Sequence, residues 1–151
     1  MTSKIADLLD GLELFNGWVY AELEILGRYL TLEEVDEDKV IFKEGDPGNF
    51  MMILTEGRVA IFKDTEHGEQ LLLREIEGRI IGEMALLDHE RRSATCVAET
   101  VCEMLTFTQT NLARLANDHP AVAYHFMSSL GRLLSKRLRR TSGILADYLG
   151  H

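Results

Sequence analysis

The hydrophobic residues of this chain change their spacing twice along its length. Over residues 1–30 they recur every three or four positions, as on one face of an α-helix, and Ser3 is a suitable N-cap. The two helical stripes consist of Ile5, Leu8, Leu9 and Leu12, followed by Val19, Leu23, Leu26 and Leu30. We therefore expect two helices before residue 31.

From residue 31 to 107 the pattern becomes one of short runs rich in Val, Ile, Leu and Phe, separated by Gly and Asp. FMMILTE at 50–56 and RVAIFKD at 58–64 are examples, and EGDPG at 44–48 is one of the intervening turn sequences. Strands this short, at such regular intervals, are typical of an antiparallel barrel or roll. We expect about eight strands, in a jelly-roll-like arrangement.

Helical spacing returns after residue 107. Residues 111–117 predict a short helix, and Pro120 suits the first turn of a long one. The apolar stripe of the long helix consists of Val122, Phe126, Leu130, Leu133, Leu134 and Leu138. The fold class is thus α+β, an antiparallel β-roll flanked by N-terminal helices and a long C-terminal helix. We expect one domain over 1–151, with helices at 1–30, the roll at 31–107 and helices at 108–151.

The composition is that of an ordinary globular domain and excludes several classes of protein. A net charge of −9 over 151 residues argues against general nucleic-acid binding or adhesion to anionic lipid. No apolar run approaches the roughly 20 residues that span a bilayer, and the N-terminus does not resemble a secretory signal. Cys96 and Cys102 are too few for a disulfide framework. These features predict a cytoplasmic protein without a membrane span.

Positive charge is concentrated in one place. Residues 131–140 contain five basic residues and no acidic one: Arg132, Lys136, Arg137, Arg139 and Arg140. Four interpretations are open: a solvated helix face, a dimer seam, a lid over a ligand, or a contact with an acidic partner.

Residues 82–95, GEMALLDHERRSAT, do not fit the strand pattern. Gly82 ends a strand, and the following residues favour a short helical turn whose free backbone N–H groups could bind a phosphate. Gly82 and Ala85 would leave room for the ligand, and Arg92 could supply a planar cation. Glu83 could accept a hydrogen bond from a sugar hydroxyl. By spacing alone, a structural ion pair between Glu83 and Arg92 is the favoured interpretation.

This segment resembles the phosphate-binding cassette of the cyclic nucleotide-binding domain family. The family pattern is Gly-Glu-apolar-Ala-Leu, a short variable stretch, and Arg-small-Ala-Thr/Ser, which corresponds here to 82–86 and 92–95. IFKEGDPG at 41–48 and Gly57 are similar to the family's early strand, turn and hairpin glycine. The resemblance extends over nearly the whole chain and implies the β-roll expected above.

The resemblance also implies a role for each cassette residue. Glu83 would accept the ribose 2′-hydroxyl, Arg92 would pair with the cyclic phosphate, and Gly82 would permit close approach. Further phosphate contacts would come from Ser93, from the Ala94 backbone, and from backbone N–H groups of the turn formed by Glu83, Met84, Ala85 and Leu86. Two positions depart from the pattern: Ile81 replaces a frequent aromatic residue, and Arg91 a frequent proline or small residue. We interpret Arg91 as facing solvent.

The resemblance favours cAMP over cGMP as the ligand, without excluding cGMP. Threonine after the cassette arginine helps cGMP binding in the family, whereas Ser93 is shared with cAMP binders. The base is usually capped from the closing helix, where the candidates are Leu133, Leu134, Arg137 and Leu138. Arg137 could stack on the purine.

We therefore expect a regulatory or sensor module that acts on a downstream protein, which the sequence does not identify. Ligand binding would pull the closing helix onto the pocket. A homodimer could form through this helix, with a seam of Phe126, Leu130, Leu133 and Leu138. Eleven residues follow Arg140, fewer than a helix-turn-helix needs, so we expect no DNA binding.

Two other functions are compatible with a β-roll. A metal-dependent enzyme on a similar roll would need clustered histidines and carboxylates, whereas the histidines of this chain are scattered. We therefore expect no catalytic residues, no metal and no cofactor beyond the nucleotide ligand. The rival function is a nucleotide-independent β-roll scaffold for protein interaction or dimerisation. The presence of both Glu83 and Arg92 argues against it.

Overall fold

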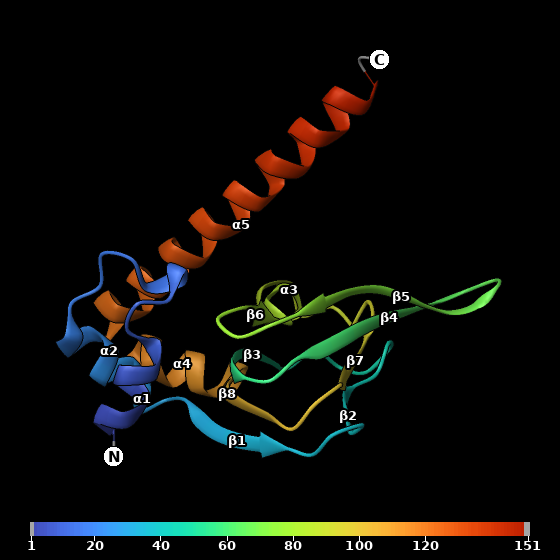
Figure 1. Cartoon of the computed structure of the whole chain (residues 1–151). Helices are drawn as coiled ribbons and strands as arrows, with labels where there is room; N and C mark the ends of the chain where they lie inside the picture. The colour runs from blue at the N-terminus through green and yellow to red at the C-terminus, as the bar shows by residue number, and fades with distance from the viewer. Residues whose placement is uncertain (1, 150–151) are drawn as a thin grey trace.

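The computed structural model describes residues 2–149, so residues 1 and 150–151 of the predicted domain lie outside it. Helices from both ends of the chain gather beside a β-roll (Figure 1). The N-terminal helices are α1 (Thr2–Leu9), the 3-10 helix η1 (Glu13–Phe15) and α2 (Tyr20–Gly27). Two sequence predictions are wrong here. Ser3 lies inside α1 rather than at its N-cap, and Val19 is 61% exposed because it precedes α2.

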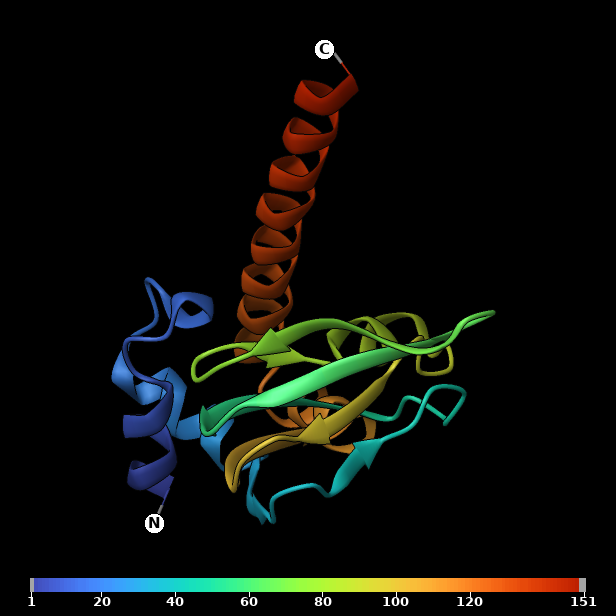
Figure 2. The ribbon, with the colours of Figure 1, turned by 45° about the vertical axis from the view of Figure 1, so that its right-hand side comes forward.

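The roll has eight strands in the described residues, as the sequence predicts. They are β1 (Thr31–Val35), β2 (Val40–Phe42), β3 (Phe50–Glu56), β4 (Val59–Thr65), β5 (Gly68–Glu75), β6 (Ile80–Ile81), β7 (Thr95–Ala98) and β8 (Cys102–Thr108). They form two antiparallel sheets in the orders β1-β8-β3-β6 and β2-β7-β4-β5. β5 is an edge strand, and its hairpin with β4 projects from the body (Figure 2).

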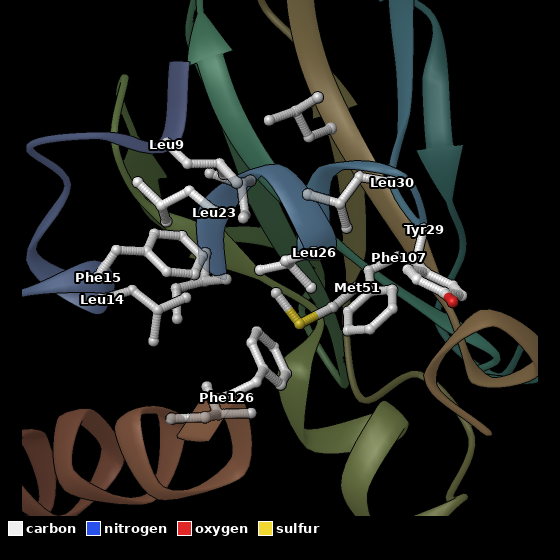
Figure 3. Close-up of a cluster of buried hydrophobic side chains, with 14 of the residues drawn as sticks. Leu9, Leu14, Phe15, Leu23, Leu26, Tyr29, Leu30, Met51, Phe107 and Phe126 are labelled. Atoms are coloured by element: carbon white, nitrogen blue, oxygen red, sulfur yellow. The ribbon is translucent and has the colours of Figure 1, made fainter. Parts of the chain in front are cut away.

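Successive residues of β3 serve two separate cores. Met52 and Leu54 point between the two sheets, whereas Met51 and Ile53 point toward the helices. This alternation follows from the two-residue period of a strand. Figure 3 shows the helical core, in which Met51 and Phe126 meet leucines from α1 and α2. Because β3 is covered on both faces, it reads as a continuous apolar run.

Two helices follow the last strand, α4 (Gln109–Asp118) and α5 (Pro120–Leu149). The first half of α5 packs into the helical core through Val122, Phe126, Leu130 and Leu133. Beyond this point the helix leaves the body of the molecule (Figures 1 and 2), and Leu138 is 68% exposed. None of the helices within residues 2–149 is both long and apolar enough to cross a membrane.

Candidate functional site

The predicted cassette is a strand, a left-handed glycine and a short helix. β6 ends at Ile81, and Gly82, which has φ +81°, follows it and precedes α3 (Glu83–Asp88). A side chain at position 82 would be strained by this φ, and its Cβ would collide with Nη1 of Arg92. Both the backbone conformation and the space beside Arg92 therefore require glycine here. Because glycine has no side chain, the N-terminus of α3 can lie next to Arg92.

Arg92 is a buried arginine enclosed by aromatic rings. It is 4% exposed, and its guanidinium carbon lies 4.2 Å from the ring centroid of Phe42 and 4.6 Å from that of Phe50. Nη1 donates to the Gly82 carbonyl at 3.2 Å, and Nη2 donates to the Phe50 carbonyl. These contacts hold the guanidinium plane in one orientation.

Arg92 has no carboxylate partner among residues 2–149, and its Nε makes no hydrogen bond. Burial lowers the pKa of the guanidinium, because the charged form is poorly solvated there. The alternative of a structural Glu83–Arg92 ion pair is therefore wrong. A buried charge is normally paired, so this arrangement calls for an anion from outside the chain.

Glu83 pairs instead with a residue of α5. It is 9% exposed, and its Oε1 lies 3.5 Å from Nη1 of Arg137. Burial raises the pKa of the Glu83 carboxyl, while Arg137 and, more weakly, Arg92 act in the opposite direction. The cassette and the C-terminal helix are thus connected through this one ion pair.

A cavity of about 600 Å³ opens between the cassette, β5 and α5, within the size range of small-molecule sites. Eight of the nine predicted site residues line it: Gly82, Glu83, Met84, Ala85, Arg92, Ser93, Ala94 and Arg137. The ninth, Leu86, is 2% exposed and packs in the helical core, so its side chain does not face the cavity.

The C-terminal helix meets the cavity through residues that sequence reasoning only partly identified. Of the four predicted capping candidates only Arg137 lines it, because Leu133 and Leu134 pack in the core and Leu138 points to solvent. Arg140 and Thr141, which the sequence analysis missed, also line it. Their spacing of three and four residues from Arg137 was a usable signal, since such residues share one helix face.

The EGDPG turn at residues 44–48 is hydrogen-bonded to the cassette at Arg91 and Arg92. The Gly45 N–H donates to the Arg92 carbonyl and the Arg92 N–H to the Asp46 carbonyl, both at 2.8 Å. Arg91 is exposed, as expected, and its Nη1 donates to the Gly45 carbonyl at 2.9 Å. Two segments that the sequence separates by more than 40 residues therefore form one unit.

The cysteines and histidines within residues 2–149 do not form a second chemical site. Cys96 and Cys102 are fully buried, and burial raises the pKa of the Cys96 thiol to about 12, which keeps it protonated at neutral pH. In the part of the chain that the structure describes, no group of three or more His, Cys, Asp or Glu residues could hold a metal ion.

Comparison with known proteins identifies a family. The sequence model of the cyclic nucleotide-binding domain matches residues 32–119. The cyclic AMP receptor protein of Thermus thermophilus is 31% identical over 132 residues, which cover 87% of this chain and 59% of that protein. A crystal structure of a cyclic nucleotide-binding domain from Methylobacillus flagellatus superposes with a TM-score of 0.83 at 26% identity, covering 97% of this chain and 83% of that one.

The same kind of domain also occurs in a relative that is an enzyme. Acetyltransferase Pat of Mycolicibacterium smegmatis is 36% identical over 95 residues, which are 63% of this chain but 28% of that protein. The chain spans 59% of the length of two curated relatives, the Thermus protein and a Mycobacterium tuberculosis regulator.

Proposed function

This chain belongs to the cyclic nucleotide-binding domain family, and we propose that it binds cAMP in preference to cGMP and acts as a non-catalytic regulatory module. The observation that carries the proposal is Arg92, a guanidinium fixed between Phe42 and Phe50, with one N–H unpaired and no carboxylate of residues 2–149 within ion-pair distance. A cyclic phosphate is an anion of suitable size and charge for this position.

The remaining contacts follow from the lining of the cavity. The phosphate would lie between Arg92 and the N-terminal N–H groups of α3, with Ser93 and Ala94 beside it. The ribose 2′-hydroxyl would donate to Glu83. The purine would extend toward α5, where Arg137 and Arg140 offer planar cations for stacking.

The choice of cAMP rests on two weaker supports. Ser93 is the residue shared with cAMP binders of the family, in place of the threonine that favours cGMP, and the Thermus thermophilus relative is named for cyclic AMP. The experiment is calorimetric titration of ligand-stripped protein with each nucleotide. We expect micromolar or tighter binding of cAMP and weaker binding of cGMP. Absence of heat and of competition with both nucleotides would instead favour the nucleotide-independent scaffold.

We further propose that the nucleotide shifts the position of α5. Glu83 is the group on which the ribose and Arg137 would converge, so the ligand would alter the ion pair that joins the cassette to α5 in the described part of the chain. A ligand shifts a conformational equilibrium only through different contacts in the two states. The Glu83–Arg137 contact supplies such a difference, and the downstream protein would respond to the displaced helix.

The acid dependence of binding tests the role of Glu83. Because burial raises its pKa, the carboxylate that accepts the ribose hydroxyl should be lost at a pH above the usual range of glutamate, and affinity should fall there. Protonation of a group with a raised folded-state pKa stabilises the fold, so this loss is not unfolding driven by Glu83. Arg137→Met should move the midpoint to still higher pH, whereas Arg140→Met, its control, should not. Calorimetry between pH 7.5 and 4.5 measures both, and a flat wild-type profile contradicts the assignment.

The predicted dimer seam is largely buried within its own chain. Phe126, Leu130 and Leu133 are buried in their own chain and are not available to a partner. We propose that a dimer forms through a different set, the exposed leucine seam of Leu138, Leu145 and Leu149.

Sedimentation velocity tests this seam. Leu138→Glu should convert a dimer to a monomer, because it introduces charge into an apolar contact. Gly143→Glu, which adds the same charge on the opposite side of the helix, should leave the dimer intact. A wild-type chain that sediments as a monomer at high micromolar concentration would refute the proposal.

A further inference from the structure

The part of α5 beyond Ser129 presents three different faces. With 100° between successive residues, their centres lie roughly 100–140° apart around the helix. The faces are the cavity face (Arg137, Arg140, Thr141), the exposed leucine seam (Leu138, Leu145, Leu149) and a basic stripe (Arg132, Lys136, Arg139). The first two have roles in the proposed function, whereas the basic stripe has none.

A second, smaller cavity of about 170 Å³ lies where the basic stripe meets the N-terminal segment. Arg132 and Lys136 line it from α5, and Glu13 and Asn16 line it from η1 and the residue after it. Its inner wall includes Ser129, which is 5% exposed. Ser129 Oγ accepts a hydrogen bond from Trp18 Nε1 at 2.9 Å and donates none within residues 2–149, so its own proton is available to a ligand.

The cations of the stripe are unpaired. Arg132, Lys136 and Arg139 have no ion pair or hydrogen bond through their side chains among the described residues, although the whole chain carries a net charge of −9. From His119 to Ala146 the sequence contains no acidic residue that could pair with them at a spacing of three or four. Glu13 is the only carboxylate lining the small cavity, and it lies more than 4 Å from both of the cavity's cations.

We propose that the small cavity and the basic stripe form a docking surface for an acidic segment of a partner protein. One carboxylate would enter the cavity, accept from Ser129 and Asn16, and pair with Arg132 and Lys136. A second carboxylate would pair with Arg139. From Arg132 to Arg139 the stripe extends for about 10 Å along the helix, too far for a single small anion to contact all three cations.

This surface is independent of the nucleotide site in composition but shares its helix. A partner bound along Arg132 to Arg139 would contact α5 at residues before and after Arg137, which pairs with Glu83. The partner would therefore respond to any displacement of the helix. The proposal stands even if the preferred nucleotide is cGMP, because no residue of the large cavity takes part in it.

The test uses the full chain and a fluorescein-labelled hexaglutamate peptide at low ionic strength. Peptide anisotropy measures affinity, and the emission of Trp18, the single tryptophan, reports whether the peptide reaches the small cavity. We expect saturable binding with a change in Trp18 emission. The double substitution Arg132→Glu with Lys136→Glu should weaken binding by roughly tenfold or more.

A matched control separates this surface from general attraction. Lys4→Glu with Lys39→Glu makes the same change in net charge at two exposed lysines of α1 and the β1–β2 turn, and should weaken binding by less than about threefold. Equal losses in the two variants, or binding without any change in Trp18 emission, would overturn the proposal. So would inorganic phosphate that displaces the peptide at equal concentration, since a small-anion site would then suffice. An unchanged circular dichroism spectrum shows that the variants are folded, whichever nucleotide the chain binds.

Discussion

Replacement of Arg92 by alanine is expected to weaken cyclic nucleotide binding by at least about a hundredfold. The guanidinium is 4% exposed and is the only cation held in the interior of the cassette by two aromatic rings in the described structure. An anion bound beside it would be poorly solvated, so its pairing with the arginine is worth more than a surface contact. Glu83→Ala should also weaken binding, but less, because it removes a hydrogen bond to a neutral hydroxyl.

Two further variants show whether the loss comes from the site itself. Arg28→Ala is the matched control, since Arg28 is exposed and does not line the large cavity, and it should change affinity by only a few-fold. Arg92→Lys keeps the charge but loses the planar fork, so we expect intermediate binding. Calorimetry measures the affinities, and circular dichroism checks the fold. Unchanged affinity in Arg92→Ala would remove Arg92 from the site.

The cassette could be predicted from sequence because its chemistry is local. Gly82, Glu83 and Arg92 lie within ten residues of each other, and the strand, turn and helix between them fix their geometry. The family pattern records this short-range arrangement. Eight of the nine predicted residues line the large cavity, while Leu86, for which only a backbone N–H contact is predicted, turns its side chain into the core.

The surroundings of these residues could not be predicted, because they depend on contacts between distant segments. Phe42 and Phe50 enclose Arg92 from 50 and 42 positions away, and nothing in a strand's sequence tells which residue its side chain will meet. The same holds for Glu83: spacing favours Arg92, ten or fewer residues away, as its partner, whereas the structure pairs it with Arg137, 54 residues away.

The apolar stripe of α5 illustrates a different limit. Periodicity predicts which face of a helix is apolar, but it does not predict how far along the helix other elements cover that face. Val122, Phe126 and Leu130 are covered by the helical core, while Leu138 continues the same kind of pattern in solvent. The predicted dimer seam combined both kinds of position, and the structure separates them.

Gly48→Ala is expected to destabilise the protein by about 1–3 kcal/mol and to weaken nucleotide binding by tenfold or more. Gly48 is buried, and a Cβ there would overlap the Cβ of Ala85 and lie 2.8 Å from the Glu90 carbonyl oxygen. Both neighbours belong to the cassette. Gln109 Nε2 donates to the carbonyls of Gly48, at 3.2 Å, and of Ala85, at 3.4 Å, so the two segments cannot separate without loss of these bonds.

The expected damage is to the position of α3. A methyl group at position 48 would push Ala85, and with it α3, away from the turn. The N–H groups at the N-terminus of α3 would then move relative to Arg92, because the Arg92 backbone stays hydrogen-bonded to Gly45 and Asp46. Urea unfolding and cAMP calorimetry measure the two effects. Gly131→Ala is the control, because position 131 is helical, exposed and free of neighbours within 4 Å, and there alanine should stabilise by about 0.5–1 kcal/mol. A folded Gly48→Ala protein with wild-type affinity would mean that this turn does not determine the position of α3 relative to Arg92. Arg92 alone would then determine where the phosphate binds.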